Sequence, residues 1–499
     1  MTEFVPTAGN HPAALLDDLT ALRRAVATDG ATAFAALRPL IGSPAAAASV
    51  LNLCHYLALR HHDIRDLQRR LMLVGLSSLG RLEGRVLATI DAVIHALAAM
   101  AGRAAPAIAA RPSSRRFFRG ETALADRAGS LFGAGDAVTR RGRIMVTLPG
   151  TAADDAAFVA DLVARGMDVA RINCAHDTPD AWRAMAAHVR AAGTAQGREV
   201  RVLMDIAGPK IRTAAVDQLE RKAKIEPGMA FRLIAEGTPH ADAEAPFAAL
   251  ASLPQLVTRL RLGDRVLYDD GKVSGRVEAR GANDALIRVD HAKTGGAKWK
   301  PEKGLNVPDT ALGLAPLTAK DEADLAVVVE VADMLGYSFI SEVGDLDLLD
   351  RDLARFGARG ARLGVIAKIE RPEAVRNLPA LIARASGSRP FGIMIARGDL
   401  AAEIGFERLA EMQEEILWLG EAASVPVIWA TQVLEDLVKD GVPSRGEMTD
   451  AAMAARAECV MLNKGPEVGA AVELLDRLMR RMNDHVHKKT PTLRALATW

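Results

Sequence analysis

The sequence predicts an α/β fold, a (β/α)8 TIM barrel that carries an inserted small β-barrel lid domain and an N-terminal α-helical extension. Three observations predict it. From about residue 143, short Ile- and Val-rich segments alternate with amphipathic helical segments. One long interval, at 214–303, instead contains short β-like runs separated by turns. The first 110 residues are rich in Ala and Leu at helical spacing.

The barrel strands are expected where short apolar segments have the composition of strands buried on both faces. Eight segments qualify: 143–149, 168–174, 198–207, 337–340, 362–369, 391–397, 426–431 and 458–463. All but one of the intervals between them hold a helical segment, such as 154–166 or 406–423. Eight strand–helix units predict a closed parallel barrel, and the active site of such a barrel lies at the carboxyl ends of its strands.

The domain boundaries follow from shifts in this pattern. Residues 1–110 form the helical extension, with helices expected over 11–28 and 62–100. Residues 111–140 are predicted to be a connector, because Arg, Ser and Gly are frequent there. The barrel comprises 141–213 and 304–490, and the lid at 214–303 follows its third strand, with a hairpin signal at Asp270-Gly271. The extension could serve packing on the barrel or oligomer contacts.

The composition is that of a soluble globular protein: of 499 residues, 49% are apolar and 25% are charged. The 63 basic and 62 acidic residues give a net charge of +1, which argues against nucleic acid or a membrane surface as a partner. Three widely spaced cysteines indicate neither a disulfide framework nor a zinc site. Without a signal-peptide pattern or an apolar run of membrane-spanning length, a cytoplasmic location is expected.

Charged and polar residues stand at the ends of the predicted strands, where the chemistry of a barrel is concentrated. A ring of cations and carboxylates suits phosphoryl transfer or enolate chemistry, in which the protein positions groups and neutralises charge. Thr431 is the lone central hydroxyl and has no base beside it in the sequence. The second strand end supplies Arg171, Asn173 and His176, and the third supplies Asp205, Lys210 and Arg212. The fifth supplies Lys368 and Glu370, the sixth Arg397 and Asp399, and the seventh Thr431 and Gln432.

Glu370 and Asp399 are the candidate metal ligands. Delivered by neighbouring strand ends beside Lys368, two carboxylates form a site for a hard divalent cation and an anionic substrate. The residues from Gly398 onward also predict a helix amino terminus, whose free N–H groups could hold a substrate carboxylate. The alternative is that Glu370 and Arg397 form only a structural ion pair at the barrel rim, and that Gly398 is a turn residue.

The order of motifs resembles that of the pyruvate kinase family over roughly residues 143–482. The matching segments are, in chain order, MDVARINCAH, MDIAGPKIRT, EKGLNVPD, LTAKDEAD, VIAKIE, IMIARGDLAAEIG, VIWATQVLE and PSRGEMTDAA. The resemblance implies a barrel with an inserted lid, and the conversion of phosphoenolpyruvate and ADP to pyruvate and ATP. It also implies a requirement for Mg²⁺, for which Mn²⁺ could substitute, and a homo-oligomeric assembly.

The resemblance further implies a role for each matching position. Glu370 and Asp399 would hold the Mg²⁺, and Lys368 would stabilise the transferring phosphoryl group and the developing enolate. Thr431 would lie by the face of the enolate that is protonated, and Gly398 and Asp399 would bind the substrate. The phosphate, nucleotide and monovalent-cation positions would be Arg171, Arg212, Asn173, His176, Lys303, Asp205 and Lys210.

Three positions depart from the pattern of family members that need K⁺. Those members carry NFSH-like and DTKGPEIRT-like motifs, whereas this chain has Ala175 and Ile206 at two hydroxyl positions and Lys210 in place of the glutamate. A tethered ammonium can supply the charge of a bound monovalent cation and would repel that cation. In the family, lysine at this place accompanies K⁺-independent activity, so K⁺ is not expected to be required. The alternative is that Lys210 is a solvated lysine at the rim.

Further departures are TLPG at 147–150, Ser341 where the family usually has arginine, and NKGPE at 463–467. The usual carboxy-terminal domain of the family, and effector binding on it, are not expected. Two other functions stay open: a barrel enzyme that uses Mg²⁺ on another pyruvate-related acid, and a catalytically weak regulatory protein that binds phosphoenolpyruvate or nucleotide. The first differs from a kinase in its substrate, and the second in binding ligand without turnover.

Overall fold

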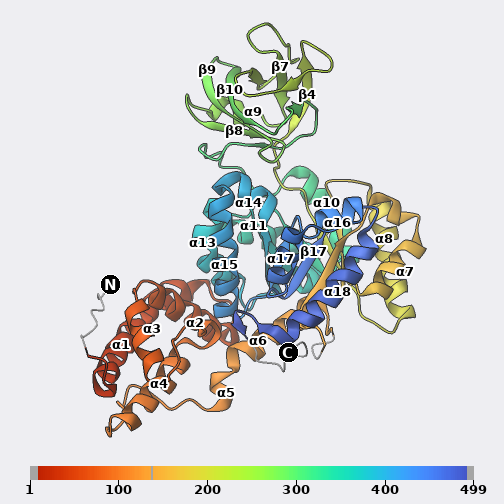
Figure 1. Ribbon diagram of the computed structural model, residues 1–499. Coiled ribbons are helices and arrows are strands. Elements are labelled where there is room, and N and C mark those ends of the chain that lie inside the picture. The colour runs from red at the N-terminus through yellow and green to blue at the C-terminus, as the bar shows by residue number, and fades with distance from the viewer. Residues whose placement is uncertain (1–8, 136–138, 492–499) are drawn as a thin grey trace.

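The computed structural model describes residues 9–135 and 139–491, which form a central barrel, a β domain above it and a helical domain beside it (Figure 1). The eight barrel strands pair in parallel in the closed order β1-β17-β16-β15-β14-β13-β3-β2, which confirms the predicted (β/α)8 barrel. Their bounds are β1 (Arg143–Thr147), β2 (Val169–Asn173), β3 (Arg201–Asp205), β13 (Met334–Tyr337), β14 (Gly364–Ile369), β15 (Phe391–Ala396), β16 (Val427–Ala430) and β17 (Cys459–Leu462).

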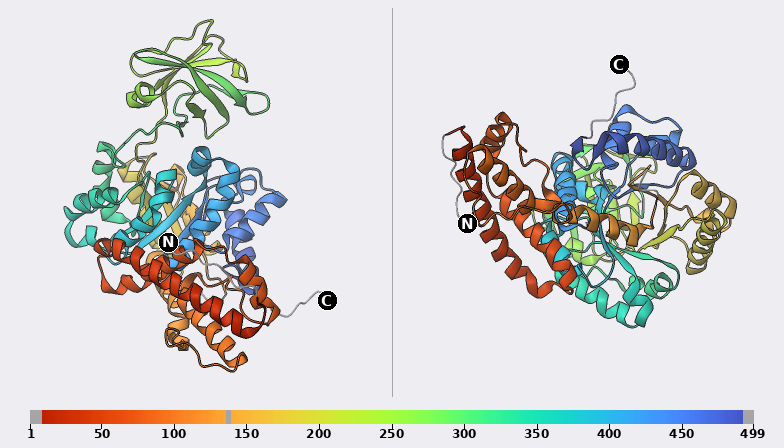
Figure 2. Two further views of the ribbon diagram at one scale, coloured as in Figure 1. Left: turned by 90° about the vertical axis from the view of Figure 1, so that its left-hand side faces the viewer. Right: turned by 90° about the horizontal axis from the view of Figure 1, so that it is seen from below.

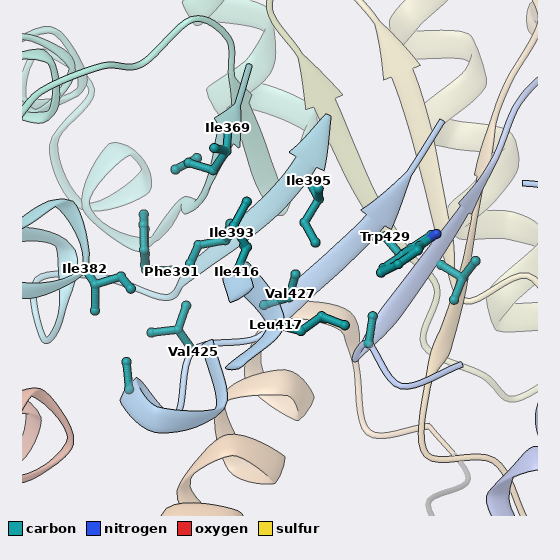
Figure 3. Close-up of a cluster of buried hydrophobic side chains, with 14 of the residues drawn as sticks. Ile369, Ile382, Phe391, Ile393, Ile395, Ile416, Leu417, Val425, Val427 and Trp429 are labelled. Atoms are coloured by element: carbon teal, nitrogen blue, oxygen red, sulfur yellow. The ribbon is translucent and has the colours of Figure 1, made fainter. Parts of the chain in front are cut away.

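Helices cover the outside of the barrel, and the longer ones bury an apolar face against the strands. Figure 3 shows part of this layer, where side chains of β15 and β16 gather with Ile416 and Leu417 of α15. None of the helices within residues 9–135 and 139–491 is long and apolar enough to cross a membrane. The covering helices are η3 (Gly150–Ala153), α7 (Ala156–Arg165), α8 (Pro179–Ala195), α10 (Ala319–Val331), α11 (Val343–Ala354), α12 (Gly357–Arg362), α13 (Pro372–Ala385), α14 (Arg397–Ile404), α15 (Phe406–Ala423), α16 (Glu435–Asp440), α17 (Arg445–Ala454) and α18 (Val468–His485).

The fourth barrel strand differs from the prediction of 337–340, because β13 spans Met334–Tyr337 and shares only Tyr337 with it. After Tyr337 the backbone turns, and Phe339 has a φ of 58°, in the left-handed region that a strand does not contain. The Phe339 N–H donates to Glu370 Oε2 at 2.6 Å. The polar end of this strand therefore begins at Ser338, which the apolar pattern of 337–340 had included in the strand.

The insertion leaves the barrel after β3, so it lies over the carboxyl ends of the barrel strands (Figure 1). Trp299 lies in its core, with ring centroids 4.6 Å from Tyr268 and 5.2 Å from Phe231. The predicted hairpin at Asp270-Gly271 is confirmed, since β8 and β9 pair antiparallel on either side of it.

One seven-stranded mixed sheet makes up most of the insertion, in the order β12-β8-β9-β10-β6-β7-β4, and β5 pairs with β11. It thus begins at Thr213 and runs to Asn306, slightly beyond the 214–303 expected from the sequence. Its elements are β4 (Thr213–Gln218), β5 (Lys224–Ile225), β6 (Ala230–Ile234), β7 (Phe247–Ala251), α9 (Pro254–Arg259), β8 (Arg265–Tyr268), β9 (Val273–Arg280), β10 (Asp284–Ala292), β11 (Ala297–Lys298) and β12 (Leu305–Asn306).

The N-terminal extension is helical, as predicted, and lies beside the barrel (Figure 2). The helix expected over 62–100 is two helices, because the chain turns between them at Gly75, with a φ of 73°, and at Leu79, with a φ of 59°. The Asn52 side chain ties the extension to the barrel by donating to Ala422 O at 2.8 Å, and it also donates to Glu83 O within the extension at 2.6 Å. The elements are α1 (Pro12–Leu37), η1 (Arg38–Leu40), α2 (Pro44–Arg60), α3 (Arg65–Leu73), η2 (Glu83–Arg85) and α4 (Val86–Met100), and the short strands β18 (Val486–His487) and β19 (Thr490–Pro491) follow α18.

Residues 111–140, expected to be a connector, contain α5 (Ser114–Phe117) and α6 (Arg119–Phe132). Leu131 and Phe132 of α6 are buried in one cluster with side chains from the barrel strands, among them Met145 and Met334. α6 therefore closes the amino end of the barrel. The frequent Arg, Ser and Gly residues concealed the helical spacing of its buried apolar face, which is Leu124, Ala128 and Leu131.

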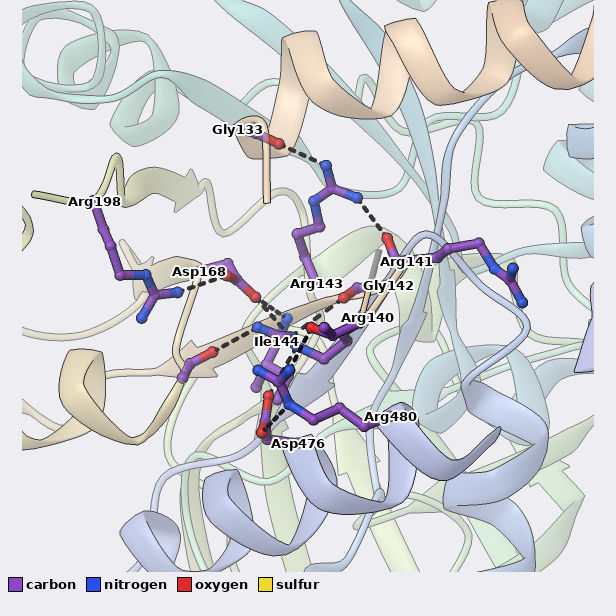
Figure 4. A network of polar contacts seen from close by, with 12 residues as sticks. Gly133, Arg140, Arg141, Gly142, Arg143, Ile144, Asp168, Arg198, Asp476 and Arg480 are labelled. Atoms are coloured by element: carbon purple, nitrogen blue, oxygen red, sulfur yellow. Dashed lines mark hydrogen bonds and ion pairs between the residues drawn. The ribbon is translucent and has the colours of Figure 1, made fainter. Parts of the chain in front are cut away.

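A polar network fastens the end of α6 to β1 and to the outer helices (Figure 4). Arg143 donates to Gly133 O at 2.8 Å. Arg140 pairs with Asp168 at 2.8 Å and with Asp476 at 2.9 Å. Because the Arg140 and Asp168 side chains are only 7% and 6% exposed, removing either partner would leave a buried unpaired charge, which is costly.

Phe132→Ala is expected to lower the free energy of unfolding by about 3–5 kcal/mol, because it opens a cavity where α6 meets the barrel interior. Urea unfolding followed by circular dichroism measures the loss. The control is Phe118→Ala, whose side chain is 46% exposed and whose replacement should cost less than about 1 kcal/mol. Equal losses in the two variants would contradict the role of α6 as part of the barrel core.

Candidate active site

Lys368, on β14, lies in a buried polar cluster at the carboxyl ends of the strands. Its Nζ is 2.9 Å from Glu370 Oε1 and 3.2 Å from Asp205 Oδ1, and it donates to Ser338 Oγ at 2.7 Å. Burial alone would lower the pKa of Lys368, but the charges of the two carboxylates outweigh burial and raise the pKa. Lys368 is therefore a charged ammonium at neutral pH.

Asp205, the last residue of β3, is shared between two cations. Its side chain is 1% exposed, and Oδ2 accepts from Arg171 Nε at 2.9 Å. Arg171 comes from the neighbouring strand β2 and also donates to Thr147 Oγ1 at 3.1 Å. Although burial acts to raise it, the charges of Lys368 and Arg171 lower the pKa of Asp205. One buried carboxylate thus fixes the positions of both cations.

Glu370 and Asp399 lie close enough for their charges to interact. Burial, together with the negative charge of Asp399, raises the pKa of Glu370, while Lys368 and the Phe339 N–H oppose the rise. Two carboxylates that repel each other in a buried setting are stabilised by a cation between them. Since Mg²⁺ takes one or two protein carboxylates and fills its other positions with water and substrate oxygens, the donor set fits this metal. Within the described residues no group of three or more His, Cys, Asp or Glu forms a complete metal cage.

Lys210 forms an ion pair with Asp399, in which Lys210 Nζ donates to Asp399 Oδ1 at 2.7 Å. In the sequence Lys210 stands between Asp205 and Arg212. In the structure its ammonium contacts Asp399, one of the two candidate metal ligands. Burial acts to lower the pKa of Lys210, but the Asp399 carboxylate raises it. With its side chain 26% exposed and this partner, Lys210 is not a freely solvated rim lysine.

Thr431 and Gly398 are joined by a hydrogen bond, in which the Gly398 N–H donates to Thr431 Oγ1 at 3.0 Å. Gly398 lies in the first turn of α14, so the predicted helix amino terminus is present at this strand end. The chain after β16 is strained, since Thr431 has a φ of 66° and Gln432 a φ of 55°. The Thr431 hydroxyl is thereby turned toward the helix that carries Asp399.

The alternative of a structural ion pair between Glu370 and Arg397 is wrong. Arg397 instead makes two bonds to Asp450 on α17, at 2.5 Å and 2.9 Å, and donates to Ala430 O at 2.9 Å. Its guanidinium also lies 4.8 Å from the ring centroid of Trp429. Arg397 is therefore buried and stabilises the segment that leads to Thr431. Glu370 pairs with Lys368.

Cations gather on the β2 side of the site. Burial, followed by the charges of Lys464, Arg212 and Arg171, lowers the pKa of His176. Arg212 stands where the chain enters the insertion, and its backbone bridges to Gly304 where the chain returns. Lys464 belongs to the departing NKGPE segment, so this segment adds a cation to the site.

Asn173 and Lys303 contact residues outside the cluster around Lys368. Asn173, directly opposite Asp205 in the β2–β3 register, accepts the Ala175 N–H at 3.1 Å through its side-chain oxygen. Lys303 lies 3.1 Å from Asp269 on the β8–β9 turn of the insertion. The structure therefore holds Lys303 within the insertion and not in the cluster around Lys368.

Sequence reasoning missed three residues that the site uses. Ser338 binds Lys368, and the signal for it was a single polar residue among apolar ones after Tyr337. Thr147 ends β1 and was noted only as part of a departing turn, although it accepts from Arg171. Asp450 has no local signal, because its partner Arg397 is 53 residues away in the sequence.

Together these groups define a class of protein. A parallel barrel whose strand ends hold a charged lysine between buried carboxylates, beneath an inserted β domain, has the features of a barrel enzyme that acts on anionic substrates. The family model of the pyruvate kinase barrel domain matches residues 139–470.

Proteins named pyruvate kinase are similar to this chain in sequence, and one solved structure is similar in fold. The pyruvate kinase of Mycobacterium tuberculosis is 34% identical over 350 residues, which are 68% of this chain and 70% of that protein. The pyruvate kinase of Aeropyrum pernix is 31% identical over 352 residues, covering 70% and 71% of the two chains. The crystal structure of a pyruvate kinase from Cryptosporidium parvum superposes with a TM-score of 0.60 at 27% identity, covering 72% of each chain. The chain belongs to the pyruvate kinase family.

Asp205→Asn is expected to destabilise the fold by about 3–5 kcal/mol at pH 7, because two cations lose their buried carboxylate. The folded-state pKa of Asp205 is lowered, so its contribution is present above the ordinary pKa of about 4 and is lost as the pH falls further. Urea unfolding at several pH values measures both effects. Asp180→Asn, at a side chain 96% exposed, is the control and should change little. A pH-independent difference between wild type and Asp205→Asn would contradict the assignment.

Proposed function

We propose that the protein transfers the phosphoryl group of phosphoenolpyruvate to ADP, giving pyruvate and ATP. The observation that carries this proposal is the charged Lys368, buried between Asp205 and Glu370 at the mouth of the barrel. Phosphoryl transfer needs positive charge that is already in position where negative charge develops. Relatives named pyruvate kinase, at 34% and 31% identity, support the same reaction.

In this proposal the chain binds the two substrates from opposite sides of Lys368. Arg171 and Arg212 neutralise phosphate charge, and Asn173 and His176 face the nucleotide. The backbone N–H groups of Gly398 and Asp399 bind the carboxylate end of phosphoenolpyruvate, for which the Gly398 N–H exchanges its bond to Thr431. Lys303 would reach the nucleotide only if the insertion moved, since Asp269 holds it in this structure.

Glu370 and Asp399 would hold a Mg²⁺ ion, or Mn²⁺ in its place, which when bound supplies positive charge to the substrate oxygens. For Asp399 to serve as a ligand, Lys210 must release or share the oxygen that it contacts at 2.7 Å. Lys368 then stabilises the phosphoryl group in transfer and the enolate left behind. Thr431 lies on the side from which the enolate carbon receives its proton, directly or through water.

We also propose that the reaction does not require K⁺. Of the positions that would coordinate a monovalent cation, Ala175 and Ile206 offer no side-chain oxygen, and such ions need several oxygens to replace their hydration shell. The remaining carboxylate, Asp205, is already matched by Lys368 and Arg171. Lys210 adds a further positive charge within the site.

We further propose a cytoplasmic enzyme that works as a homo-oligomer. Its three cysteines are free and buried, which suits a reducing compartment. Phe406, at the start of α15, is 75% exposed, and Val442 is 70% exposed. These two side chains are the candidate contact points with a second copy of the chain.

Lys368→Met tests the proposed function. Pyruvate formation from phosphoenolpyruvate and ADP with Mg²⁺, followed by a lactate dehydrogenase coupled assay, should be readily measured for the wild type and about 100-fold or more slower for the variant. Lys439→Met, at a side chain 58% exposed, is the control and should keep wild-type turnover. The absence of wild-type turnover, or near-normal turnover of Lys368→Met in a folded protein, would refute the proposal.

Lys210→Glu tests the independence from K⁺. The variant loses a cation and gains an anion, so its turnover should be low with Na⁺ and rise at least about tenfold when K⁺ replaces Na⁺ at equal ionic strength. Lys210→Gln is the matched control, because it removes the ammonium without adding a carboxylate and should show no such recovery. If Lys210→Glu responds identically to the two cations, the tethered-cation account fails.

A further inference from the structure

A polar cavity lies at the amino ends of the barrel strands, opposite the proposed catalytic site. Its volume is about 680 Å³, within the range of small-molecule sites. It lies among α8, α10 and α12, and α6 contributes Ser130 and Leu131 to its wall. The first residues of β3, β13 and β14 form its floor, whereas Asp205 and Lys368 lie toward the other ends of β3 and β14.

Arginine dominates the lining of this cavity, which we call the arginine cavity. Five guanidinium groups accompany two lining carboxylates, Glu330 and Asp333, and two more carboxylates, Asp180 and Glu199, pair with the same arginines, which leaves an excess of one positive charge. Such an excess concentrates anions, and guanidinium is the group best suited to phosphate because its N–H donors form a planar fork. The five are Arg183, Arg190, Arg201, Arg359 and Arg362.

Glu330 and Asp333 already form ion pairs with three of the arginines. Arg183 Nη2 lies 2.9 Å from Glu330 Oε2, and its Nε donates to the same carboxylate at 3.0 Å. Asp333 receives Arg190 at 2.8 Å and Arg201 at 3.3 Å. Arg183 also pairs with Asp180 at 3.1 Å, and Arg201 pairs with Glu199 at 2.9 Å, so carboxylates balance these three arginines.

Arg359 and Arg362, on successive turns of α12, are different. Both are exposed, and both donate to backbone carbonyls: Arg359 to Glu330 O at 2.8 Å and Arg362 to Ala358 O at 3.2 Å. Neutral carbonyls do not balance a guanidinium charge, and each guanidinium has five N–H donors. The bond of Arg359 also caps the carboxyl end of α10, but the bond of Arg362 lies within α12 and has no such structural use.

We propose that the arginine cavity binds a small organic phosphate, with Arg359 and Arg362 on the phosphate oxygens. The remaining positive charge, the two exposed guanidinium groups whose hydrogen bonds go to carbonyls and the size of the cavity together point to this class of ligand. The site is separate from the proposed catalytic site, because it lies at the amino ends of the strands. Its occupation requires neither a divalent cation nor turnover.

Arginine footprinting with phenylglyoxal tests this proposal, with pyrophosphate as the probe and no divalent cation present. Pyrophosphate at about five times its Kd leaves about one-sixth of the sites free, so modification of Arg359 and Arg362, mapped by mass spectrometry, should slow about sixfold. Arg408 and Arg477 are controls in the same sample, because they are 55% and 56% exposed and lie elsewhere, paired with Glu411 and Glu473. Inorganic phosphate, tested alongside, shows whether one phosphate group suffices.

Calorimetry on two double variants gives a second readout. Pyrophosphate binding should weaken at least about tenfold in Arg359→Ala/Arg362→Ala, since two charge-assisted contacts are lost, and stay unchanged in Arg408→Ala/Arg477→Ala. Any binding of pyrophosphate at the proposed catalytic site would be common to both variants. Protection that NaCl reproduces at the same ionic strength, protection that extends to Arg408 and Arg477, or equal affinities of the two variants would overturn the proposal.

Discussion

The carboxylate of Asp205, buried between Lys368 and Arg171, is the interaction on which the rest of the site depends. A lone buried carboxylate is costly, and so are two buried cations, but together they form a stable group. Because the three side chains come from β3, β14 and β2, the group can form only when the barrel closes with its observed register. The same contacts that stabilise the closed barrel therefore hold Lys368 in place as a charged ammonium.

The charge balance of this group extends to its neighbours. Glu370 accepts hydrogen bonds from Lys368 and from the Phe339 N–H. The hydrogen bond from Phe339 requires the turn with positive φ that ends β13 early. Asp399 has its own cation in Lys210. Asp205, Glu370 and Asp399 are thus each matched by a cation of the chain itself, and a metal ion or a substrate phosphate would act on this prearranged set of charges.

The sequence predicted the barrel because its strands are nearly continuous apolar segments that end in charged residues, and it predicted Lys368, Glu370 and Asp399 as neighbours because parallel strand ends meet. Local pattern could not identify partners distant in the chain, so the bond between Arg397 and Asp450 was missed. It also placed Ser338 inside a strand, since one polar residue among apolar ones does not disclose a turn. In α6, a polar exposed face concealed the apolar face that fills the barrel.

We propose that cations of the chain, and not a bound monovalent ion, balance the carboxylates of the site. The most direct test is pyruvate formation by the wild-type protein from phosphoenolpyruvate and ADP with Mg²⁺, in parallel reactions with Na⁺ or K⁺ as the only monovalent cation. Balance by the cations of the chain predicts equal turnover in the two reactions. Turnover that appears only with K⁺ would contradict it, and no turnover in either would contradict the proposed function as well.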